Sequence, residues 1–315
     1  MKVLITGVTG FVGNFLADYL IEKGIEVWGT TRSDKKYIDT INGRKVRLIR
    51  NDLKSIDRIN KVLSEINPDR VFHLSGQSNV RKSWSNVQET LLNNVNDTIN
   101  LFDACKDYQE GYPNFKLLTI GSSEEYGIPL NPNKPLSENT LLNPYNPYGT
   151  AKAAVSYLAS QYQREYGLNV IHARPFNHIG VGQRKGFVVS DFIDQILKFE
   201  NNFIDKIKIG NLNISRDFTD VRDIVRGYDF IINQGVTGEV YNVCSQNTIS
   251  IEEILNILIS FSPKKVALEQ DFNLFRKIDN PKIIGCNHKI TQLGWKPYYT
   301  IEETLYEIYS SMKKK

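Results

Sequence analysis

The sequence predicts an α/β fold, in which a doubly wound parallel sheet of the Rossmann type is followed by a smaller C-terminal region. Short apolar strands alternate with amphipathic helices through the first half of the chain, a pattern typical of a parallel sheet covered by helices on both faces. A glycine-rich turn joins the first strand to the first helix. Beyond about Asn177 the elements shorten, and Pro, Gly and Asn interrupt them.

The elements of this sheet follow one another in order along the chain. Because connections between parallel strands are right-handed in nearly all proteins, alternating strands and helices wind onto both faces of one sheet. The predicted strands are residues 2–6, 26–30, 47–50, 70–74 and 116–120, and the predicted helices are residues 14–23, 56–66, 87–106, 190–197 and 251–261.

Composition and charge exclude several classes of protein. The 315 residues are 41% hydrophobic, enough for a large core, and 39 basic residues nearly balance 35 acidic ones. A net charge of +4, with both signs mixed along the chain, is too small to indicate a nucleic-acid-binding surface. No apolar run approaches the roughly 18 residues typical of a membrane-spanning helix. We therefore expect no nucleic-acid or membrane partner.

The three cysteines, Cys105, Cys244 and Cys286, are far apart and match no metal-ligand or redox spacing. We expect them to be free thiols, as in a cytosolic protein. The apolar run at the N-terminus is too short for a secretion signal, which also predicts a cytoplasmic protein. No cluster of His, Cys and Asp residues indicates a metal site.

Three glycines, Gly7, Gly10 and Gly13, lie in the segment G-V-T-G-F-V-G between the first strand and the first helix. Glycine there permits a tight turn and lets backbone N–H groups approach a pyrophosphate at the helix N-terminus. An ordinary strand-to-helix turn is the alternative, but this position at the start of an alternating fold favours dinucleotide binding. The predicted site also includes the intervening residues Thr9, Phe11 and Val12.

The end of the second predicted strand bears on the choice between NAD and NADP. NAD-binding folds usually place an acidic residue there, about 20 residues after the glycines, to bind the ribose hydroxyls. This chain has Thr31-Arg32-Ser33 and no acid before Asp34. Arg32 can pair with the 2′-phosphate of NADP, although a solvated loop arginine is the alternative. The sequence favours NADP(H) and leaves NAD(H) open.

Tyr148 and Lys152 form a Y-x-x-x-K motif at the start of a helix that follows a proline-rich turn. The spacing places both side chains on one helical face. A lysine ammonium one turn away stabilises tyrosinate and so lowers the pKa of the phenol towards the working pH. Such a tyrosine can exchange a proton with a sugar hydroxyl or ketone while hydride moves to or from a nicotinamide.

Polar residues also follow the fifth predicted strand, in Ser122-Ser123-Glu124. Active sites of open α/β sheets lie outside the carboxyl ends of the strands, so Ser122 is placed to hydrogen-bond the reacting oxygen beside Tyr148 and Lys152. A turn-forming serine is the alternative. Ser123 and Glu124 are candidate acid–base or sugar-binding groups.

With these motifs the chain resembles those members of the extended short-chain dehydrogenase/reductase family that modify nucleotide sugars. The resemblance covers nearly the whole length, including H-L-S-G-Q-S at 73–78, N-V-N-D-T at 94–98, R-P-F-N-H at 174–178 and G-W-K-P at 294–297. Members that reduce GDP-linked 4-keto-6-deoxy sugars are the most similar, in G-S-S-E-E-Y-G at 121–127, G-F-V-V-S-D-F at 186–192 and S-R-D-F-T-D-V at 215–221.

The resemblance implies further binding residues. Asp52, Leu53 and Leu74 correspond to cofactor-binding positions. Arginine's planar fork suits the phosphates of the nucleotide, although Arg216 and Arg276 could instead pair with nearby aspartates. Where relatives have R-P-x-E/D, this chain has R-K-I-D at 276–279, so this loop departs from the family pattern. The implied substrate-binding residues are Gln77, Ser78, Asn177, Val188, Arg216 and Arg276.

The implied activity is reduction of carbon 4, from GDP-4-keto-6-deoxy-D-mannose to GDP-D-rhamnose. A nucleotide-sugar 4,6-dehydratase is the first alternative, because GDP-mannose dehydratases have Thr-Ser-Glu where this chain has Ser122-Ser123-Glu124, and Glu124 could serve as the base at carbon 5. A 4-epimerase or dehydrogenase is the next. A non-catalytic NADP-binding sensor would not need the Ser122, Tyr148 and Lys152 set.

The resemblance also implies how the chain is divided. Residues 1–176, with roughly 215–245, are expected to form the NADP-binding Rossmann domain, and residues 177–214 and 246–315 the nucleotide-sugar-binding region. The resemblance to this family also implies that the protein assembles as a homodimer.

Overall fold

The computed structural model describes residues 1–129, 131, 133–275 and 280–314. Its centre is an eight-stranded sheet in the order β11-β7-β6-β5-β1-β2-β4-β3, with β3 antiparallel to β4 and every other neighbouring pair parallel. The predicted fold class is confirmed, and β3, β7 and β11 are strands that the sequence analysis did not predict. The strands are β1 Lys2–Thr6, β2 Glu26–Thr31, β3 Tyr37–Asp39, β4 Lys45–Arg50, β5 Arg70–His73, β6 Lys116–Ile120, β7 Val170–Pro175 and β11 Val240–Val243.

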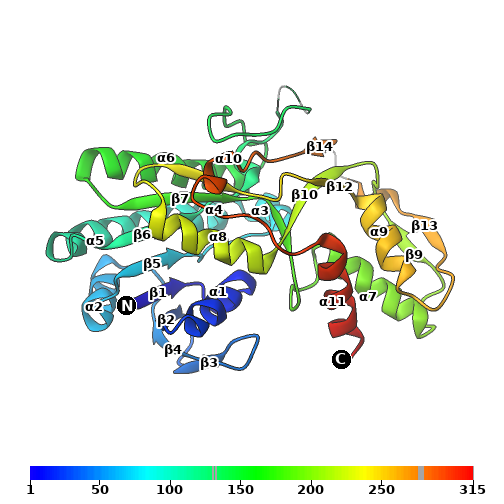
Figure 1. The fold of residues 1–315 in the computed structure, drawn as a ribbon, viewed down its shortest axis with the longest axis horizontal. Helices are drawn as coiled ribbons and strands as arrows, with labels where there is room; N and C mark the ends of the chain where they lie inside the picture. The colour runs from blue at the N-terminus through cyan, green and yellow to red at the C-terminus, as the bar shows by residue number, and fades with distance from the viewer. Residues whose placement is uncertain (130, 132, 276–279, 315) are drawn as a thin grey trace.

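Helices cover both faces of this sheet (Figure 1). Alternate residues of a strand point to opposite faces, so β1 contributes Val3 and Ile5 to one hydrophobic cluster and Leu4 to the other. Helices α1 and α8 pack on the first face, and α2, α5 and α6 on the second. The helices are α1 Phe11–Glu22, α2 Ile56–Ile66, α5 Asp97–Gly111, α6 Pro147–Tyr166 and α8 Val221–Gln234.

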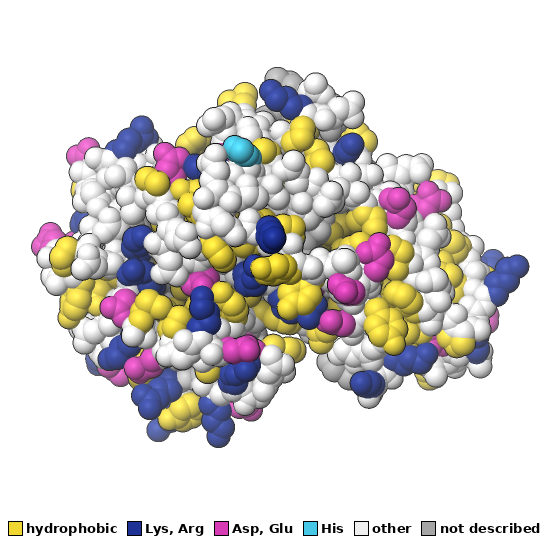
Figure 2. Space-filling model, in the orientation of Figure 1, with side chains coloured by type: hydrophobic (Ala, Val, Ile, Leu, Met, Phe, Trp, Pro, Cys, Tyr) yellow, Lys and Arg dark blue, Asp and Glu magenta, His cyan; other side chains and the backbone are white. Residues whose placement is uncertain are grey.

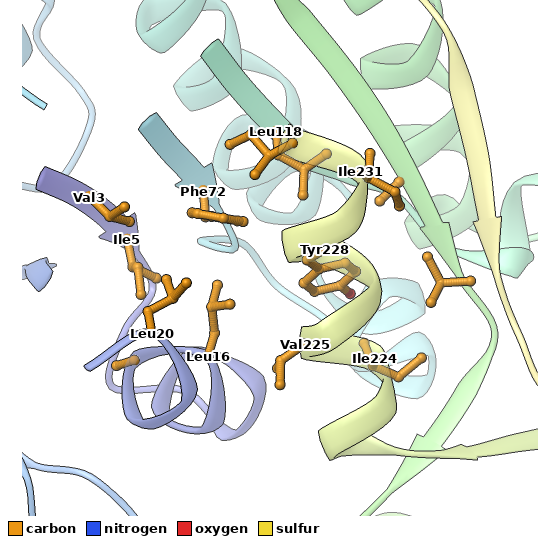
Figure 3. Packing of buried hydrophobic residues seen from close by; sticks show 14 of the residues in the cluster. Val3, Ile5, Leu16, Leu20, Phe72, Leu118, Ile224, Val225, Tyr228 and Ile231 are labelled. Atoms are coloured by element: carbon orange, nitrogen blue, oxygen red, sulfur yellow. The ribbon is translucent and has the colours of Figure 1, made fainter. Parts of the chain in front are cut away.

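Helix α8 follows a strand of the smaller sheet in sequence, yet it packs in the core of the main one. Figure 3 shows its residues Tyr228 and Ile231 facing Leu118 and Phe72 of the sheet, with Leu16 of α1 alongside. Burying an apolar side chain of this size contributes about 1.5–3 kcal/mol. Helix α8, more than 200 residues away from β1 in sequence, therefore helps to cover this face of the main sheet.

The single helix predicted over residues 87–106 is divided. Helix α4, Val87–Leu91, passes into a π-helical turn, η1 Leu92–Asn96, and then into α5. A preceding short helix, α3 Val80–Ser85, was not predicted. The π turn places the buried Asn94 so that its amide nitrogen donates to the carbonyl oxygens of Gln77 (3.2 Å) and Thr90 (2.8 Å), and π turns often occur at functional sites.

The C-terminal region has its own hydrophobic cluster, in which α7, α9 and α11 pack together. The helices predicted at 190–197 and 251–261 are confirmed as α7 and α9. Strand β10 pairs with β8, β12 and β14 in a four-stranded sheet, and β9 pairs with β13. The elements are β8 Asn177–Ile179, α7 Val188–Glu200, β9 Ile207–Ile209, β10 Ser215–Asp220, β12 Thr248–Ser250, α9 Ile251–Ser260, β13 Leu268–Gln270, η3 Phe272–Leu274, β14 Lys282–Ile283, α10 His288–Thr291 and α11 Ile301–Lys313.

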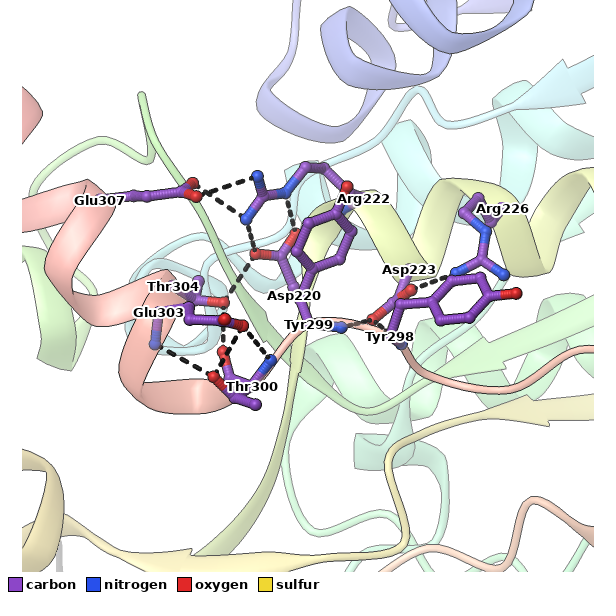
Figure 4. Close-up of polar contacts among 10 residues, drawn as sticks. All are labelled: Asp220, Arg222, Asp223, Arg226, Tyr298, Tyr299, Thr300, Glu303, Thr304 and Glu307. Carbon is purple, nitrogen blue, oxygen red and sulfur yellow. Dashed lines mark hydrogen bonds and ion pairs between the residues drawn. The ribbon is translucent and has the colours of Figure 1, made fainter.

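A polar network fastens α11 to the start of α8 (Figure 4). The fully buried carboxylate of Asp223 accepts hydrogen bonds from the backbone N–H groups of Tyr298 (2.8 Å) and Tyr299 (3.0 Å). The Asp220 carboxylate accepts a hydrogen bond from the Thr304 hydroxyl at 2.7 Å and pairs with Arg222. The C-terminal helix is thereby fixed to the helix that closes the main sheet.

The strands of the main sheet point their carboxyl ends toward the lobe that carries α7, α9 and α11 (Figure 1). A notch separates the two lobes on the face seen in Figure 2, where acidic and basic side chains are interspersed. Among the helices of the described residues, none combines the length and apolar character needed to cross a membrane.

Candidate active site

The glycine turn after β1 is shaped for close approach of another backbone and of a ligand. Gly7 has a φ of +74°, and a Cβ there would lie 2.8 Å from the Ser75 nitrogen. A Cβ on Gly13 would lie 2.4 Å from the Gly7 oxygen. Both positions therefore require glycine. Leu74, whose backbone carbon would lie 2.9 Å from a Cβ on Gly7, is half-buried directly after β5.

The N-terminus of α1 is suited to an anion. The helix begins at Phe11, three residues earlier than predicted, and its first backbone hydrogen bond runs from Asn14 to Gly10. The N–H groups of Phe11, Val12 and Gly13 therefore have no acceptor within the helix. In the described chain no side chain caps this end and no acid lies in its first turn. With Thr9 exposed beside it, the turn fits the pyrophosphate of a dinucleotide.

Arg32 is exposed at the end of β2. The first acid after it, Asp34, pairs instead with Arg50 at 2.7 Å. The Thr31 hydroxyl accepts a hydrogen bond from the Ser33 nitrogen at 3.2 Å and so shapes this loop. The Arg32 guanidinium thus occupies the position where an NAD-binding fold usually has an acid. The Asp34 carboxylate does not compete with it.

The loop after β4 lies next to this strand end. Asp52 is half-buried, with its carboxylate 4.0 Å from the Arg58 guanidinium. Leu53 is buried at a φ of +62°, and its N–H donates to the Asn51 side chain at 2.7 Å. Burial, with Asp52 adding to it, raises the pKa of Asp97, while Lys54 and Arg32 oppose the rise. Asp52 and Arg32 thus act in opposite directions on the pKa of the same carboxyl group.

Helix α6 carries the predicted Tyr148 and Lys152. Pro147 occupies its first turn, and the buried Asn146 side chain caps it by accepting the Gly149 N–H at 2.8 Å. The Lys152 ammonium lies 5.9 Å from the centroid of the Tyr148 ring and donates to the Ile120 carbonyl at 2.7 Å. The lysine therefore joins α6 to the carboxyl end of β6.

Tyr148 and Lys152 have pKa values shifted in opposite directions. Burial, with Glu124 and Glu125 adding to it, raises the pKa of Tyr148, and the interaction with the Ser122 side chain opposes the rise. Burial lowers the pKa of Lys152 to about 8, while Glu125 opposes that change. The expectation that Lys152 lowers the tyrosine pKa is wrong for the protein alone, because burial disfavours tyrosinate more strongly.

The turn after β6 brings the other predicted catalytic residues next to α6. Residues Ser123–Glu125 form a 3-10 turn, η2, in which Ser123 is buried. The Glu124 carboxylate accepts a hydrogen bond from the Asn146 amide at 2.7 Å. A Cβ on Gly149 would lie 2.5 Å from the backbone carbonyl oxygen of Glu124. The lack of a side chain at Gly149 therefore lets the turn contact the helix that carries Tyr148.

The predicted substrate-binding residues that the structure describes lie on four segments: the loop after β5, strand β8, helix α7 and strand β10. Gln77 donates to the Asn79 carbonyl (3.0 Å) and the Thr90 hydroxyl (3.3 Å), so its amide orders the loop after β5, and Ser78 in that loop is exposed. Asn177, exposed at the start of β8, pairs in register with Phe218 of β10.

Two further predicted residues complete this group. Val188 is half-buried at the first position of α7. The buried Arg216 donates to the carbonyl oxygens of Ser215 (2.9 Å) and Asn280 (2.7 Å). Strands β8 and β10 thus bring Asn177 and Arg216 into one sheet. Arg276 lies outside the described residues.

His178 connects the cofactor turn to the smaller sheet. Its ring stacks on Phe11, with centroids 6.3 Å apart and planes 6° apart, and its Nδ1 hydrogen-bonds the Phe176 carbonyl at 2.9 Å. Burial lowers its pKa. This histidine orders the chain after β7, and its contacts include no acid–base partner among those described.

Several residues that the structure places at this site were not predicted from the sequence. The Oδ1 atom of Asn94 is buried with no hydrogen-bond partner in the described chain. A Cβ on Gly76 would lie 2.4 Å from that atom and 3.9 Å from the Lys152 ammonium. Asn94 lies within N-V-N-D-T, so the motif was visible in the sequence, but the inward direction of its side chain depends on the π turn. Asn146, which contacts Glu124, was also missed.

The glycine turn, the tyrosine–lysine helix and the serine turn meet at the carboxyl edge of one doubly wound sheet, which is the arrangement of an NAD(P)-dependent oxidoreductase. A sequence model of the family described as GDP-mannose 4,6 dehydratase matches residues 4–308. The chain belongs to this family and is an NAD(P)-dependent nucleotide-sugar oxidoreductase of the extended short-chain dehydrogenase/reductase class.

The relatives include a reductase and a dehydratase. GDP-6-deoxy-D-mannose reductase of Pseudomonas aeruginosa is 30% identical, over 100% of this chain and 98% of its own. GDP-mannose 4,6 dehydratase 1 of Arabidopsis thaliana is 27% identical, over 95% of this chain and 86% of its own. The structure of RMD from Pseudomonas aeruginosa complexed with NADPH has a TM-score of 0.84 at 29% identity and covers 99% of both chains.

Proposed function

We propose that this chain reduces carbon 4 of a 4-keto-6-deoxy nucleotide sugar, converting GDP-4-keto-6-deoxy-D-mannose to GDP-D-rhamnose. The extent of the similarity carries this proposal. The matched region spans 98% of the Pseudomonas reductase but only 86% of the Arabidopsis dehydratase, which has more chain than this protein matches. D-Rhamnose is 6-deoxy-D-mannose, so the sugar in the reductase's name is the product proposed here.

Tyr148 is the proton donor of the proposed reaction. Because burial raises its pKa, it keeps its proton at neutral pH and can give it to the oxygen at carbon 4 as the ketone becomes an alcohol. Ser122 orients that oxygen. Lys152 in its charged form stabilises the tyrosinate that remains. NADPH, when bound, supplies the hydride that completes the reduction of carbon 4.

The glycine turn and α1 hold the dinucleotide through Gly7, Thr9, Gly10, Phe11, Val12 and Gly13. Arg32 pairs with the 2′-phosphate, so NADPH is preferred over NADH, and Asp52, Leu53 and Leu74 surround the rest of the dinucleotide. The NADPH in the Pseudomonas structure supports this choice.

The nucleotide sugar lies between the sheet and the smaller region, residues 177–214 and 246–315. Asn177, Val188 and Arg216 contact it from that region, with Gln77 and Ser78 opposite. Arg216 is the phosphate ligand among these, because its guanidinium is charged at any working pH.

A 4,6-dehydratase is the second candidate, and Glu124 is the observation that favours it. A dehydratase needs a carboxylate to remove the proton at carbon 5, and Glu124 lies in the turn beside Tyr148. In the reductase proposed here, the same carboxylate orients the sugar and fixes Asn146 at the start of α6.

A homodimer is the proposed assembly. The exposed apolar side chains Trp84, Leu91, Leu92 and Tyr157 lie on α3, α4, η1 and α6, and these elements pack against one another. A second copy would cover them.

We expect sedimentation equilibrium to give twice the mass of the chain and Trp84→Glu to weaken the association. A monomeric wild-type protein would contradict the proposed homodimer.

Replacing Tyr148 by Phe keeps the ring and removes the hydroxyl. We expect turnover to fall by about 10² to 10⁴-fold, the usual contribution of a general acid, while NADPH binding, followed by fluorescence titration, stays within about twofold. Tyr166→Phe, at an exposed position of the same helix, is the matched control. Wild-type turnover in Tyr148→Phe would remove this residue from the mechanism.

Arg32→Ala tests the choice of cofactor. A charge-assisted contact is worth about 1.5–3 kcal/mol, so the KM for NADPH should rise about 10- to 150-fold, and the KM for NADH should change little. Arg164→Ala, an exposed arginine of α6, should leave both values unaltered. Equal effects of Arg32→Ala on the two cofactors would reverse the assignment.

Glu124→Gln separates the two candidate reactions. A single hydrogen bond contributes about 0.5–1.5 kcal/mol, so the variant should retain ketone reduction within about tenfold of wild type, as should the exposed control Glu165→Gln. Wild-type protein should consume one NADPH for each product, whose configuration at carbon 4 is read by NMR. If it instead forms a 4-keto sugar from GDP-mannose in D₂O, with deuterium at carbon 5, the reductase proposal is wrong.

A further inference from the structure

Glu125 is a fully buried carboxylate that the sequence analysis did not assign to the site. It lies in the turn after β6, one residue beyond Glu124. One carboxylate oxygen accepts the Ser122 N–H at 2.8 Å, and the other accepts the Arg174 Nε–H at 2.7 Å. The His172 ring nitrogen lies 3.2 Å from the first oxygen. Glu125 thus contacts the backbone of a proposed catalytic residue directly.

Arg174 makes this carboxylate part of a wider network. The guanidinium also donates to the Tyr126 hydroxyl at 2.8 Å and to the Ser156 hydroxyl of α6 at 3.0 Å. Its three nitrogens therefore join the turn after β6, strand β7 and helix α6. Separating Glu125 from Arg174 would leave each buried charge uncompensated. The pairing is therefore strongly favoured.

Several titratable groups face Glu125 from the elements packed around it. His172 and Arg174 come from β7, Tyr148 and Lys152 from α6, and Tyr126 and Glu124 from the same turn. Burial lowers the pKa of His172, although Glu125 opposes this, so Arg174 is the principal counter-charge. The pKa of Glu125 is lowered despite its burial, chiefly by Arg174 and then His172, so it is ionised.

We propose that Glu125 is a positioning residue for proton donation: through its bond to the Ser122 N–H it fixes the serine beside the Tyr148 hydroxyl, and its charge keeps Lys152 in the ammonium form. This inference rests on the proposed reduction, in which Tyr148 gives up its proton and Lys152 stabilises the tyrosinate. The charge of Glu125 raises the pKa of both residues, which favours a protonated tyrosine beside a protonated lysine.

Glu125→Gln tests the kinetic consequence. The amide keeps the size of the side chain and an oxygen that can accept the Ser122 N–H, but it removes the charge. We expect kcat for the keto sugar to fall about 10- to 100-fold, with KM for sugar and NADPH within about twofold. Glu138→Gln is the matched control, because that carboxylate contacts the same network through the Asn242 N–H (2.8 Å) and should leave kcat within about twofold.

A second measurement needs no sugar and so separates this inference from the proposed reaction. Lysine labelled with ¹³C at Cε reports the titration of Lys152, assigned by comparison with Lys152→Arg. We expect a midpoint near pH 8 in the wild type and a midpoint lower by about one pH unit in Glu125→Gln. The Glu138→Gln midpoint should equal the wild-type one.

The two readouts distinguish a positioning role from a structural one. A lower Lys152 midpoint together with a lower kcat in Glu125→Gln supports the inference. An unchanged Lys152 midpoint in Glu125→Gln overturns the inference. If kcat then falls only in proportion to the folded fraction of the variant, measured by urea denaturation, the role of Glu125 is structural. An unchanged kcat in an active enzyme overturns it as well. If the wild-type protein does not turn over the keto sugar, the proposed reaction is wrong. The Lys152 titration then tests the role of Glu125 independently.

Discussion

The buried ion pair between Glu125 and Arg174 is the constraint on which the site depends. It joins the turn after β6 to β7, and Arg174 continues to Ser156 of α6. A buried charge is tolerated only when it is paired and hydrogen-bonded, so neither partner can turn away without cost. The serine turn and the tyrosine helix are therefore held at fixed positions relative to each other, before any ligand binds.

The parallel sheet supplies the second constraint. Because its strands end at one edge, residues far apart in sequence meet there. The turn after β1 contacts the backbone that follows β5, where a side chain on Gly7 would collide with Leu74 and Ser75. Lys152 reaches the last residue of β6. The proposed cofactor turn and the proposed proton donor thus lie at one edge of the sheet through backbone geometry, and the smaller lobe faces the same edge (Figure 1).

Enclosure has opposite effects on the two central titrating groups. Burial disfavours the charged form of each, so it raises the pKa of the phenol and lowers that of the amine to about 8. A phenol that retains its proton is suited to donating it to a ketone oxygen, and a lysine with this pKa is close to losing its charge in the working range. The charge of Glu125 opposes that loss, which links the buried ion pair to the proposed chemistry.

The sequence by itself determined the alternating sheet, the glycine turn and the face shared by Tyr148 and Lys152, because each depends on local periodicity or on a steric property of one residue type. It did not reveal β7 and β11, nor the π turn that directs Asn94 inward. It also could not distinguish Glu124 from Glu125. Neighbouring residues in a turn follow no fixed period, so only the position of Arg174 on β7 decided which carboxylate is buried and which one faces Asn146.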